Sequence, residues 1–222
     1  MIRFENLTKR FVLHGQSKMI MQNVNLTIPS RTSVALLGRN GAGKSTLLRM
    51  IAGTMDATSG RILSTGSISW PVGFAGSFHP DLSGAQNTKF IARVYGVDTN
   101  ALSDFVEDFA ELGKHFRLPL RSYSSGMRSR LAFGVSMGIG FDTYLVDEVT
   151  SVGDAAFRSK ATELFNARMA ESGAIVVSHS MPQIRQMCDS ALVLEHGKAH
   201  YFENLEEAIA LHESNMQGPR MA

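Results

Sequence analysis

The chain has 222 residues, a formal net charge of +2 and a hydrophobic fraction of 44%. This length and composition suit one domain, with room for an inserted lobe, around a sizeable core. The small positive charge is not concentrated in a run of basic residues, so nucleic acid is not an expected partner. The one cysteine, Cys188, excludes a disulfide within the chain.

The first residues lack the apolar segment of a secretory signal, and no apolar run approaches the ~20 residues that cross a bilayer. We therefore expect a cytoplasmic protein. If it works at a membrane, a second polypeptide is expected to supply the path through the bilayer.

The first part of the chain predicts mostly strands. Alternating or continuous apolar residues indicate them at 2–7, 19–28, 33–37, 61–63 and 68–70. The run at 33–37 is apolar almost throughout, which is typical of a strand buried on both faces of a parallel sheet. Residues 47–52 predict a helix.

A different lobe is predicted to follow. Residues 71–81 combine glycines and aromatic residues without a period, which indicates a loop. Helical spacing then predicts helices at 87–95, 101–116 and 128–137. We expect one domain in which a helical lobe over about 83–135 is inserted into a core of 1–82 and 136–212, with a tail at 213–222.

The remainder alternates strands and helices. Strands are predicted at 143–148, 174–178, 191–195 and 199–202, and helices at 154–170, 182–188 and 204–212. The last two strands flank His196-Gly197-Lys198, which predicts a hairpin. Together the elements predict an α/β fold with a mixed sheet, an antiparallel β portion near the N-terminus and an inserted helical lobe.

A glycine-rich stretch separates the strand at 33–37 from the helix at 47–52. It fits the P-loop pattern, which is glycine, four residues, then Gly-Lys-Ser. Glycines let backbone N–H groups turn inward, and a helix N-terminus adds unpaired N–H groups and partial positive charge. The flanking elements favour a nucleoside-triphosphate site over a chance turn. The residues are Gly38, Arg39, Asn40, Gly41, Ala42, Gly43, Lys44, Ser45 and Thr46.

Two side chains of this motif carry specific expectations. Lys44 is expected to reach the β- and γ-phosphates, and the Ser45 hydroxyl to bind Mg²⁺. The pair Asp147-Glu148 ends an apolar strand. There, Asp147 can hold Mg²⁺ through water, and Glu148 can orient and deprotonate an attacking water. Read alone, the pair also fits a surface acidic pair at a strand end.

In this order, the motifs resemble those of the ATP-binding subunits of ABC transporters, over essentially the whole chain. Residues 38–45 resemble Walker A, residues 144–147 resemble Walker B, and Glu148 takes the catalytic-base position. Residues 123–127, Tyr-Ser-Ser-Gly-Met, resemble a variant of the signature Leu-Ser-Gly-Gly-Gln. The family's P-loop fold, ATP hydrolysis and Mg²⁺ requirement are the corresponding expectations.

The resemblance implies further site residues. Residues 151–154 resemble the D-loop, which adds Asp154 to the catalytic set of Lys44, Glu148 and His179. His179 resembles the switch histidine, which contacts the γ-phosphate. Phe11 stands where the family has an aromatic residue stacked on adenine. The signature residues expected to face a partner subunit's γ-phosphate are Ser124, Ser125 and Gly126.

His79 departs from the family, which usually has glutamine at this position of the loop between the two lobes. That residue contacts Mg²⁺ or the attacking water and touches the membrane subunit. A neutral histidine can also bind a metal or accept a hydrogen bond. We expect a lever role in preference to direct metal contact, with an ordinary loop histidine as the alternative.

Three segments resemble capsular polysaccharide exporters: 68–74, the run that begins at Tyr123, and 146–154. Residues 78–84 are more similar to the related O-antigen exporters. The resemblance implies a homodimer of ATPase subunits, bound peripherally to an integral membrane permease at the cytoplasmic face of the inner membrane. ATP hydrolysis would drive export of a polysaccharide, of the capsular type.

Other functions stay open at this stage. The cargo is alternatively an O-antigen or a teichoic acid. A soluble ABC ATPase of translation or DNA repair usually has two ATPase halves or a long coiled-coil insertion, and neither is seen here. A regulatory module that binds nucleotide without hydrolysis is disfavoured by Glu148 and His179. Arg117, Arg121, Arg128 and Arg130 fit either solvated helix faces or contacts with an anionic glycan or lipid.

Overall fold

The structure is a computed structural model, and it describes residues 1–13, 15–147 and 155–217. The chain divides into two compact units. The core unit comprises 1–69, 141–148 and 171–222, and the helical unit comprises 70–140 and 149–170. The helical unit is larger than the predicted lobe at 83–135, since it also includes 70–82, 136–140 and 155–170, which the sequence assigned to the core.

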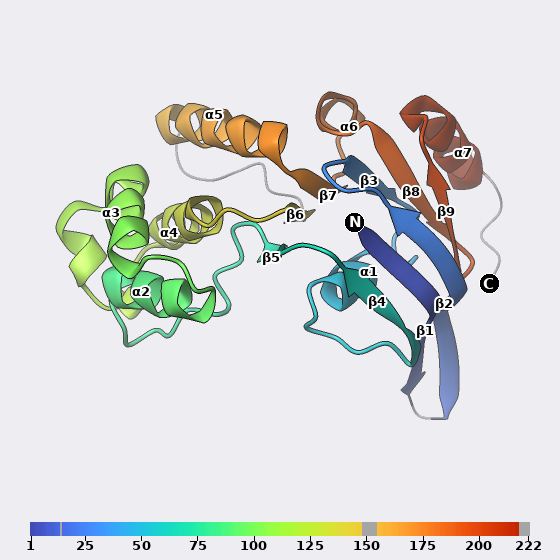
Figure 1. Cartoon of the computed structure of the whole chain (residues 1–222), viewed down its shortest axis with the longest axis horizontal. Helices are drawn as coiled ribbons and strands as arrows, with labels where there is room; N and C mark the ends of the chain where they lie inside the picture. The colour runs from blue at the N-terminus through green and yellow to red at the C-terminus, as the bar shows by residue number, and fades with distance from the viewer. Residues whose placement is uncertain (14, 148–154, 218–222) are drawn as a thin grey trace. The chain divides into compact units, whose positions relative to one another are not determined.

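An antiparallel sheet opens the core unit (Figure 1). Its strand order is β2-β1-β4, formed by β1 (Ile2–Leu13), β2 (Gln16–Ile28) and β4 (Ser59–Ser64). Both predicted N-terminal strands are longer in the structure, because the segments after Leu7 and before Met19 also pair with each other. This sheet is the antiparallel β portion that the sequence predicts.

The second sheet has the order β5-β6-β7-β3-β8-β9. Strands β6, β7, β3 and β8 run parallel, and β9 pairs antiparallel with β8, so the sheet is mixed as predicted. Its strands are β5 (Ile68–Pro71), β6 (Thr143–Asp147), β7 (Gly173–Val177), β3 (Ser33–Leu37), β8 (Ser190–Glu195) and β9 (Lys198–Phe202).

Three helices belong to the core unit: α1 (Lys44–Ile51), α6 (Met181–Met187) and α7 (Leu205–Gln217). One hydrophobic core includes Leu7 and Met21 of the antiparallel sheet, Leu47 of α1, and Leu145 and Ile175 of the second sheet. All five of these side chains are almost completely buried. The core therefore fixes α1, and the loop that precedes it, against both sheets.

The carboxyl ends of the parallel strands meet at one edge of the second sheet. There, β3 leads to the glycine-rich loop, β6 ends at Asp147, and β7 leads to His179. Because β7 lies between β6 and β3, the three segments that follow these strands are neighbours. This is the edge where open α/β sheets bind ligands.

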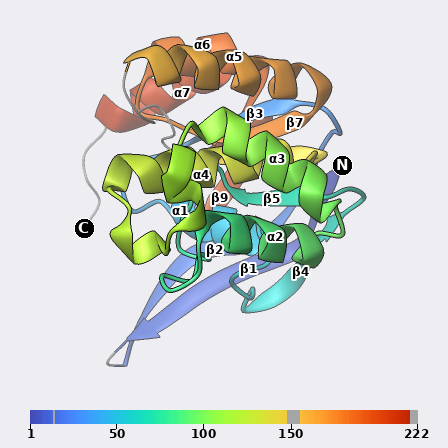
Figure 2. The same ribbon diagram turned by 90° about the vertical axis from the view of Figure 1, so that its left-hand side faces the viewer.

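The helical unit contains α2 (Gly84–Val94), α3 (Thr99–Ala110), α4 (Ser125–Gly138) and α5 (Ala155–Glu171), as Figure 2 shows for the first three. Helix α2 begins three residues before its predicted start. Ser83 and Gln86 form a capping box there, in which each side chain bonds the other residue's backbone N–H.

Aromatic packing holds the helical unit together. The ring of Phe109 on α3 lies 5.9 Å from that of Phe133 on α4 and 5.2 Å from that of Phe157 on α5, between centroids. Gly134 lets α4 approach closely, since an added Cβ would lie 3.3 Å from the Phe109 ring and would press against it. Lys160 of α5 pairs with Glu111 after α3 at 2.7 Å.

Cys188, in the core unit, is buried, and burial together with the nearby Asp189 carboxylate raises the pKa of its thiol to about 12. It therefore packs as a small apolar residue at neutral pH.

None of the helices in the described ranges is long and apolar enough to cross a membrane.

Asp142 links the segments that enter β5 and β6, and it gives a first testable prediction. The backbone N–H and hydroxyl of Ser67 donate to its carboxylate at 2.8 and 2.7 Å, which lowers its pKa. A lowered pKa in the folded state stabilises the fold above the unfolded carboxyl pKa of ~3.9, and this contribution is lost as pH falls through the folded value.

We expect Asp142→Asn to lower the free energy of unfolding at pH 7 by at most about 1 kcal/mol, because the carboxylate is exposed. The difference from wild type should shrink below pH ~3.9, where the carboxylate becomes protonated. Urea unfolding at pH 7 and at lower pH measures it, with Asp56→Asn as a control at another exposed carboxylate. A difference that does not change with pH would contradict this account.

Candidate functional site

The loop between β3 and α1 is shaped by glycine backbone geometry. Gly38, Gly41 and Gly43 have φ values of 153°, 83° and 105°, in the region that favours glycine. A Cβ at Gly38 would lie 2.7 Å from the carbonyl oxygen of Leu194, and one at Gly43 would collide with Ile20. Gly43 is the N-cap residue of α1, and no described side chain caps that helix. Its first N–H groups can therefore bind an anion.

Lys44 lies over this loop. Its ammonium donates to the carbonyl oxygens of Gly38 at 2.6 Å and Arg39 at 3.2 Å. Inside the loop, the Ala42 N–H donates to the Arg39 carbonyl at 3.0 Å. The loop thus holds its one lysine above its own backbone, where the charge adds to that of the helix N-terminus. Ser45 is exposed and Thr46 is half-buried in the next turn.

A cavity of about 570 Å³ adjoins the loop within the core unit. Its wall brings together parts of the chain that lie far apart in sequence, and it includes the predicted site residue His179. The lining residues are Lys18, Met19, Ile20, Gly38, Arg39, Asn40, Gly41, Ala42, His179, Leu194, Glu195, His196, Gly197, His212 and Met216. This volume is in the range of ligand pockets in proteins.

Helix α7 contributes to the cavity, which the sequence analysis did not predict. A guanidinium nitrogen of Arg39 donates to the backbone oxygen of Asn215 at 3.0 Å, and His212 lies in the cavity wall. The helix continues to Gln217, beyond the predicted end at His212. One signal could have found it: residues 213–217 contain no helix breaker, and Gly-Pro follows only at 218–219.

His212 is sensitive to the charge on the loop. Burial lowers its pKa most, and the positive charge of Lys44 lowers it further, whereas the carboxylates of Glu195 and Glu213 act in the opposite direction. The electrostatic influence of Lys44 thus extends from the loop to His212 in the cavity wall.

Of the three predicted acidic site residues, the structure describes one, Asp147. Asp147 is half-buried at the end of β6, opposite Val177 of β7. Glu148 and Asp154 lie outside the described residues. Asp147 and the loop after β3 therefore share the same edge of the sheet, as parallel strands require.

The signature-like segment begins α4 in the helical unit. The Ser124 hydroxyl accepts from the Met127 N–H at 3.2 Å and caps the helix. Ser124 and Ser125 are exposed and Gly126 is half-buried, so this helix N-terminus is open to solvent. Tyr123 is buried, and its hydroxyl donates to the His115 carbonyl at 2.7 Å. The tyrosine therefore packs inside the unit, while the two residues after it are presented outward.

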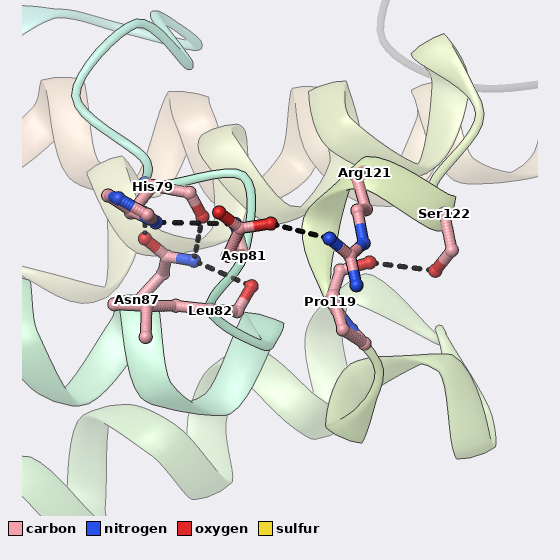
Figure 3. A network of polar contacts seen from close by, with 7 residues as sticks. All are labelled: His79, Asp81, Leu82, Asn87, Pro119, Arg121 and Ser122. Atoms are coloured by element: carbon pink, nitrogen blue, oxygen red, sulfur yellow. Dashed lines mark hydrogen bonds and ion pairs between the residues drawn. The ribbon is translucent and has the colours of Figure 1, made fainter.

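Phe11 and His79 are the remaining predicted residues. Phe11 is 39% exposed on β1, with the Lys9 ammonium 4.9 Å from its ring centroid, and it is not part of the cavity wall. Its cross-strand partner Lys18 does line the cavity. His79 is exposed in the loop before α2, within a network of polar contacts (Figure 3).

The influence of Lys44 on His212 can be measured directly. Removing the cation with Lys44→Ala should raise the pKa of His212 towards its usual value, because a positive charge that disfavours the imidazolium is gone. An NMR titration of the histidine ring follows it, with Lys18→Ala as the control, since Lys18 lines the cavity but is not among the charges that shift the pKa of His212. An unchanged pKa in Lys44→Ala would show that the two groups are not coupled.

Comparisons with known proteins show which family the chain belongs to. The chain is 49% identical to the polysialic acid transport ATP-binding protein KpsT of Escherichia coli, over 94% of this chain and 95% of that protein. It is 42% identical to the capsule polysaccharide export ATP-binding protein CtrD of Neisseria meningitidis, over 96% and 99%. An O-antigen export system ATP-binding protein, RfbB of Klebsiella pneumoniae, is 32% identical over 92% and 85%.

Among solved structures, the dimeric, ADP- and phosphate-bound ATP-binding cassette MJ0796 matches with a TM-score of 0.71 at 20% identity, over 90% of this chain and 97% of that one. This likeness confirms the predicted fold. The family model described as ABC transporter matches residues 21–151. The chain is therefore a member of the ABC transporter family, and the relatives named above are ATP-binding proteins of that family.

Proposed function

We propose that this chain is the ATP-hydrolysing subunit of an ABC exporter that moves a polysaccharide, of the capsular type, across the inner membrane. The observation that carries the proposal is the glycine-shaped loop: its residues 38–42 share one cavity wall with His179, and the Lys44 ammonium lies over its backbone. The relatives named for polysialic acid transport and capsule export support the cargo, because they match over almost their whole length. The O-antigen relative is more distant, which places that cargo second.

In this proposal, the loop binds the triphosphate of ATP. Backbone N–H groups of the loop that have no partner within it, together with those at the N-terminus of α1, donate to the phosphates, and Lys44 supplies a full charge. His179 contacts the γ-phosphate, and Glu148 orients and deprotonates the attacking water. Transfer of a phosphoryl group to water depends on this positioning and charge stabilisation more than on covalent chemistry.

Ser45 and Asp147 are the residues that would hold Mg²⁺. A hydroxyl and a carboxylate are oxygen donors of the kind this ion prefers, and two protein ligands leave positions for phosphate oxygens and water. The described residues contain no cluster of three or more His, Cys, Asp or Glu that could hold a metal. When bound, the ion would neutralise negative charge on the phosphates.

The proposed assembly is a homodimer on a membrane permease. The chain has one loop of the P-loop type and one signature-like segment. If each nucleotide lies between the loop of one subunit and Ser124, Ser125 and Gly126 of the other, two subunits related by a two-fold axis complete two sites. Asp154 would belong to the same interface, and Phe11 would stack on adenine. The permease would supply the membrane path and position the complex at the cytoplasmic face.

Lys44→Ala should reduce ATP hydrolysis by the purified transporter complex at least about 100-fold, since one preorganised charge at a transferring phosphoryl group is lost. Polysaccharide export should stop, while circular dichroism stays unchanged. Lys114→Ala, at an exposed lysine of the helical unit, is the control and should behave as wild type. Near-normal hydrolysis by Lys44→Ala would refute the site.

The shared site predicts that ATP stabilises the dimer. Glu148→Gln should bind Mg²⁺ and ATP but hydrolyse slowly, so the closed dimer should accumulate, because a ligand held by both subunits favours their association. Light scattering with and without ATP measures it. Adding Ser124→Arg should abolish the closed dimer.

Crosslinking between cysteines introduced at Ser45 and Ser124 of different subunits gives an independent measurement of the same interface. The crosslink should form with ATP and not without it. If Glu148→Gln hydrolyses at the wild-type rate, the assignment of the base is wrong. If the crosslink never forms between subunits, the shared-site arrangement is wrong.

A further inference from the structure

His79 is held through its backbone by a buried side chain of α2. The Asn87 carbonyl oxygen accepts from the His79 N–H at 2.8 Å, and its amide group donates to the His79 carbonyl at 3.1 Å (Figure 3). The same amide also donates to the carbonyls of Leu82 and Ser83 at 3.2 and 3.0 Å. Asn87 is 1% exposed, so it closes the loop before α2 from inside the helical unit.

The imidazole ring of His79 also accepts a hydrogen bond. The backbone N–H of Asp81 donates to its Nδ1 atom at 3.2 Å. A nitrogen that accepts a hydrogen bond carries no proton, so in the neutral ring the proton is on Nε2. In this tautomer Nε2–H is the one donor of the ring, and the lone pair of Nδ1 already accepts the hydrogen bond from Asp81. In this arrangement the ring has no nitrogen free to bind a metal ion.

A third set of contacts ties this loop to the segment that precedes Ser124. The Asp81 carboxylate pairs with Arg121 at 2.8 Å. The backbone N–H groups of Arg121 and Leu120 donate to the carbonyls of Pro80 and Leu82 at 2.9 and 3.0 Å. The position of the His79 ring therefore depends on contacts on both sides: Asn87 below the loop and 120–121 beside it.

We propose that His79 acts as an Nε2–H hydrogen-bond donor and not as a metal ligand, and that Asn87 is the positioning residue that presents it. This inference rests on the proposed function for its catalytic consequence. The acceptor is an oxygen, either at the nucleotide, as water or phosphate, or on the permease. A glutamine at this position would offer both an amide donor and a carbonyl oxygen, whereas this chain keeps only the donor.

The tautomer can be tested without any assay of hydrolysis. Long-range ¹H–¹⁵N NMR spectra of the full chain, labelled at histidine, distinguish Nε2–H from Nδ1–H rings. His79→Gln identifies the signal of His79 by its loss. We expect the Nε2–H pattern in wild type at neutral pH, and a mixed pattern in Asn87→Ala. An Nδ1–H pattern in wild type would overturn the proposal.

The donor role is tested in the complex with the permease. His79→Gln keeps an amide donor near the place of Nε2, whereas His79→Glu offers only oxygens that suit a metal. We expect His79→Gln to retain most of the hydrolysis and His79→Glu to lose about tenfold, as one hydrogen bond to a charged or reacting group would give. The Mg²⁺ concentration for half-maximal activity should be the same in wild type and His79→Gln. The reverse order of activity would indicate a metal ligand and overturn the proposal.

Asn87 is tested beside a matched neighbour. Asn87→Ala should lower kcat and leave the KM for ATP unchanged, because no hydrogen-bond partner of Asn87 belongs to the phosphate loop. Thr88→Val removes another buried polar group of α2, whose hydroxyl donates to Gly84 and does not touch His79. An equal loss of kcat in the two variants would reduce Asn87 to a structural residue and overturn its positioning role.

The source of the acceptor follows from comparing subunit and complex. If His79→Glu also slows the isolated ATPase subunit, the acceptor is at the nucleotide, and if only the permease-stimulated rate falls, it is on the permease. Either result supports the donor role, and no loss in both overturns it. A wild-type complex that does not hydrolyse ATP would instead refute the proposed function, while the NMR result would still decide the tautomer.

Discussion

The site depends on a backbone constraint at the junction of β3 and α1. Three glycines take backbone conformations that other residues rarely adopt, and the last of them leads into the N-terminus of α1. Two of them have no room for a methyl group, because the Leu194 carbonyl and Ile20 lie against them. The neighbours that exclude a side chain come from β8 and β2. The loop is therefore shaped by both sheets of the core unit as well as by its own sequence.

This explains how much the sequence could predict. The loop motif, the parallel strands and the residues that follow them depend on local pattern: apolar runs for β3, β6 and β7, and glycine spacing for the loop. The family and the α/β fold were predicted from the same patterns and are confirmed by the comparisons. The roles of Glu148 and Asp154 stay predictions, since both lie outside the described residues.

Features that depend on long-range contacts were not predictable in this way. Arg39 donates a hydrogen bond to the backbone oxygen of Asn215, which lies 176 positions later in the sequence. Nothing in the local pattern of either residue indicates this contact. In the sequence, Asn87 is an ordinary polar residue near a helix start. In the structure it can be buried because its side-chain amide bonds three backbone carbonyls and one backbone N–H. Helix starts were misplaced for a different reason, because Ser83 and Ser124 cap α2 and α4 through local hydrogen bonds, and the Ser83–Gln86 capping box is a sequence signal that the prediction did not use.

Burial of Cys188 has a practical consequence. A thiol whose pKa is about 12 is almost wholly protonated at neutral pH, and alkylating reagents react with the thiolate. The side chain is also shielded from reagents in solution, with 6% of its surface exposed. A cysteine placed at any exposed position would therefore carry a fluorophore or spin label selectively in the native background. Distances between labelled positions can then be followed during turnover without first replacing Cys188.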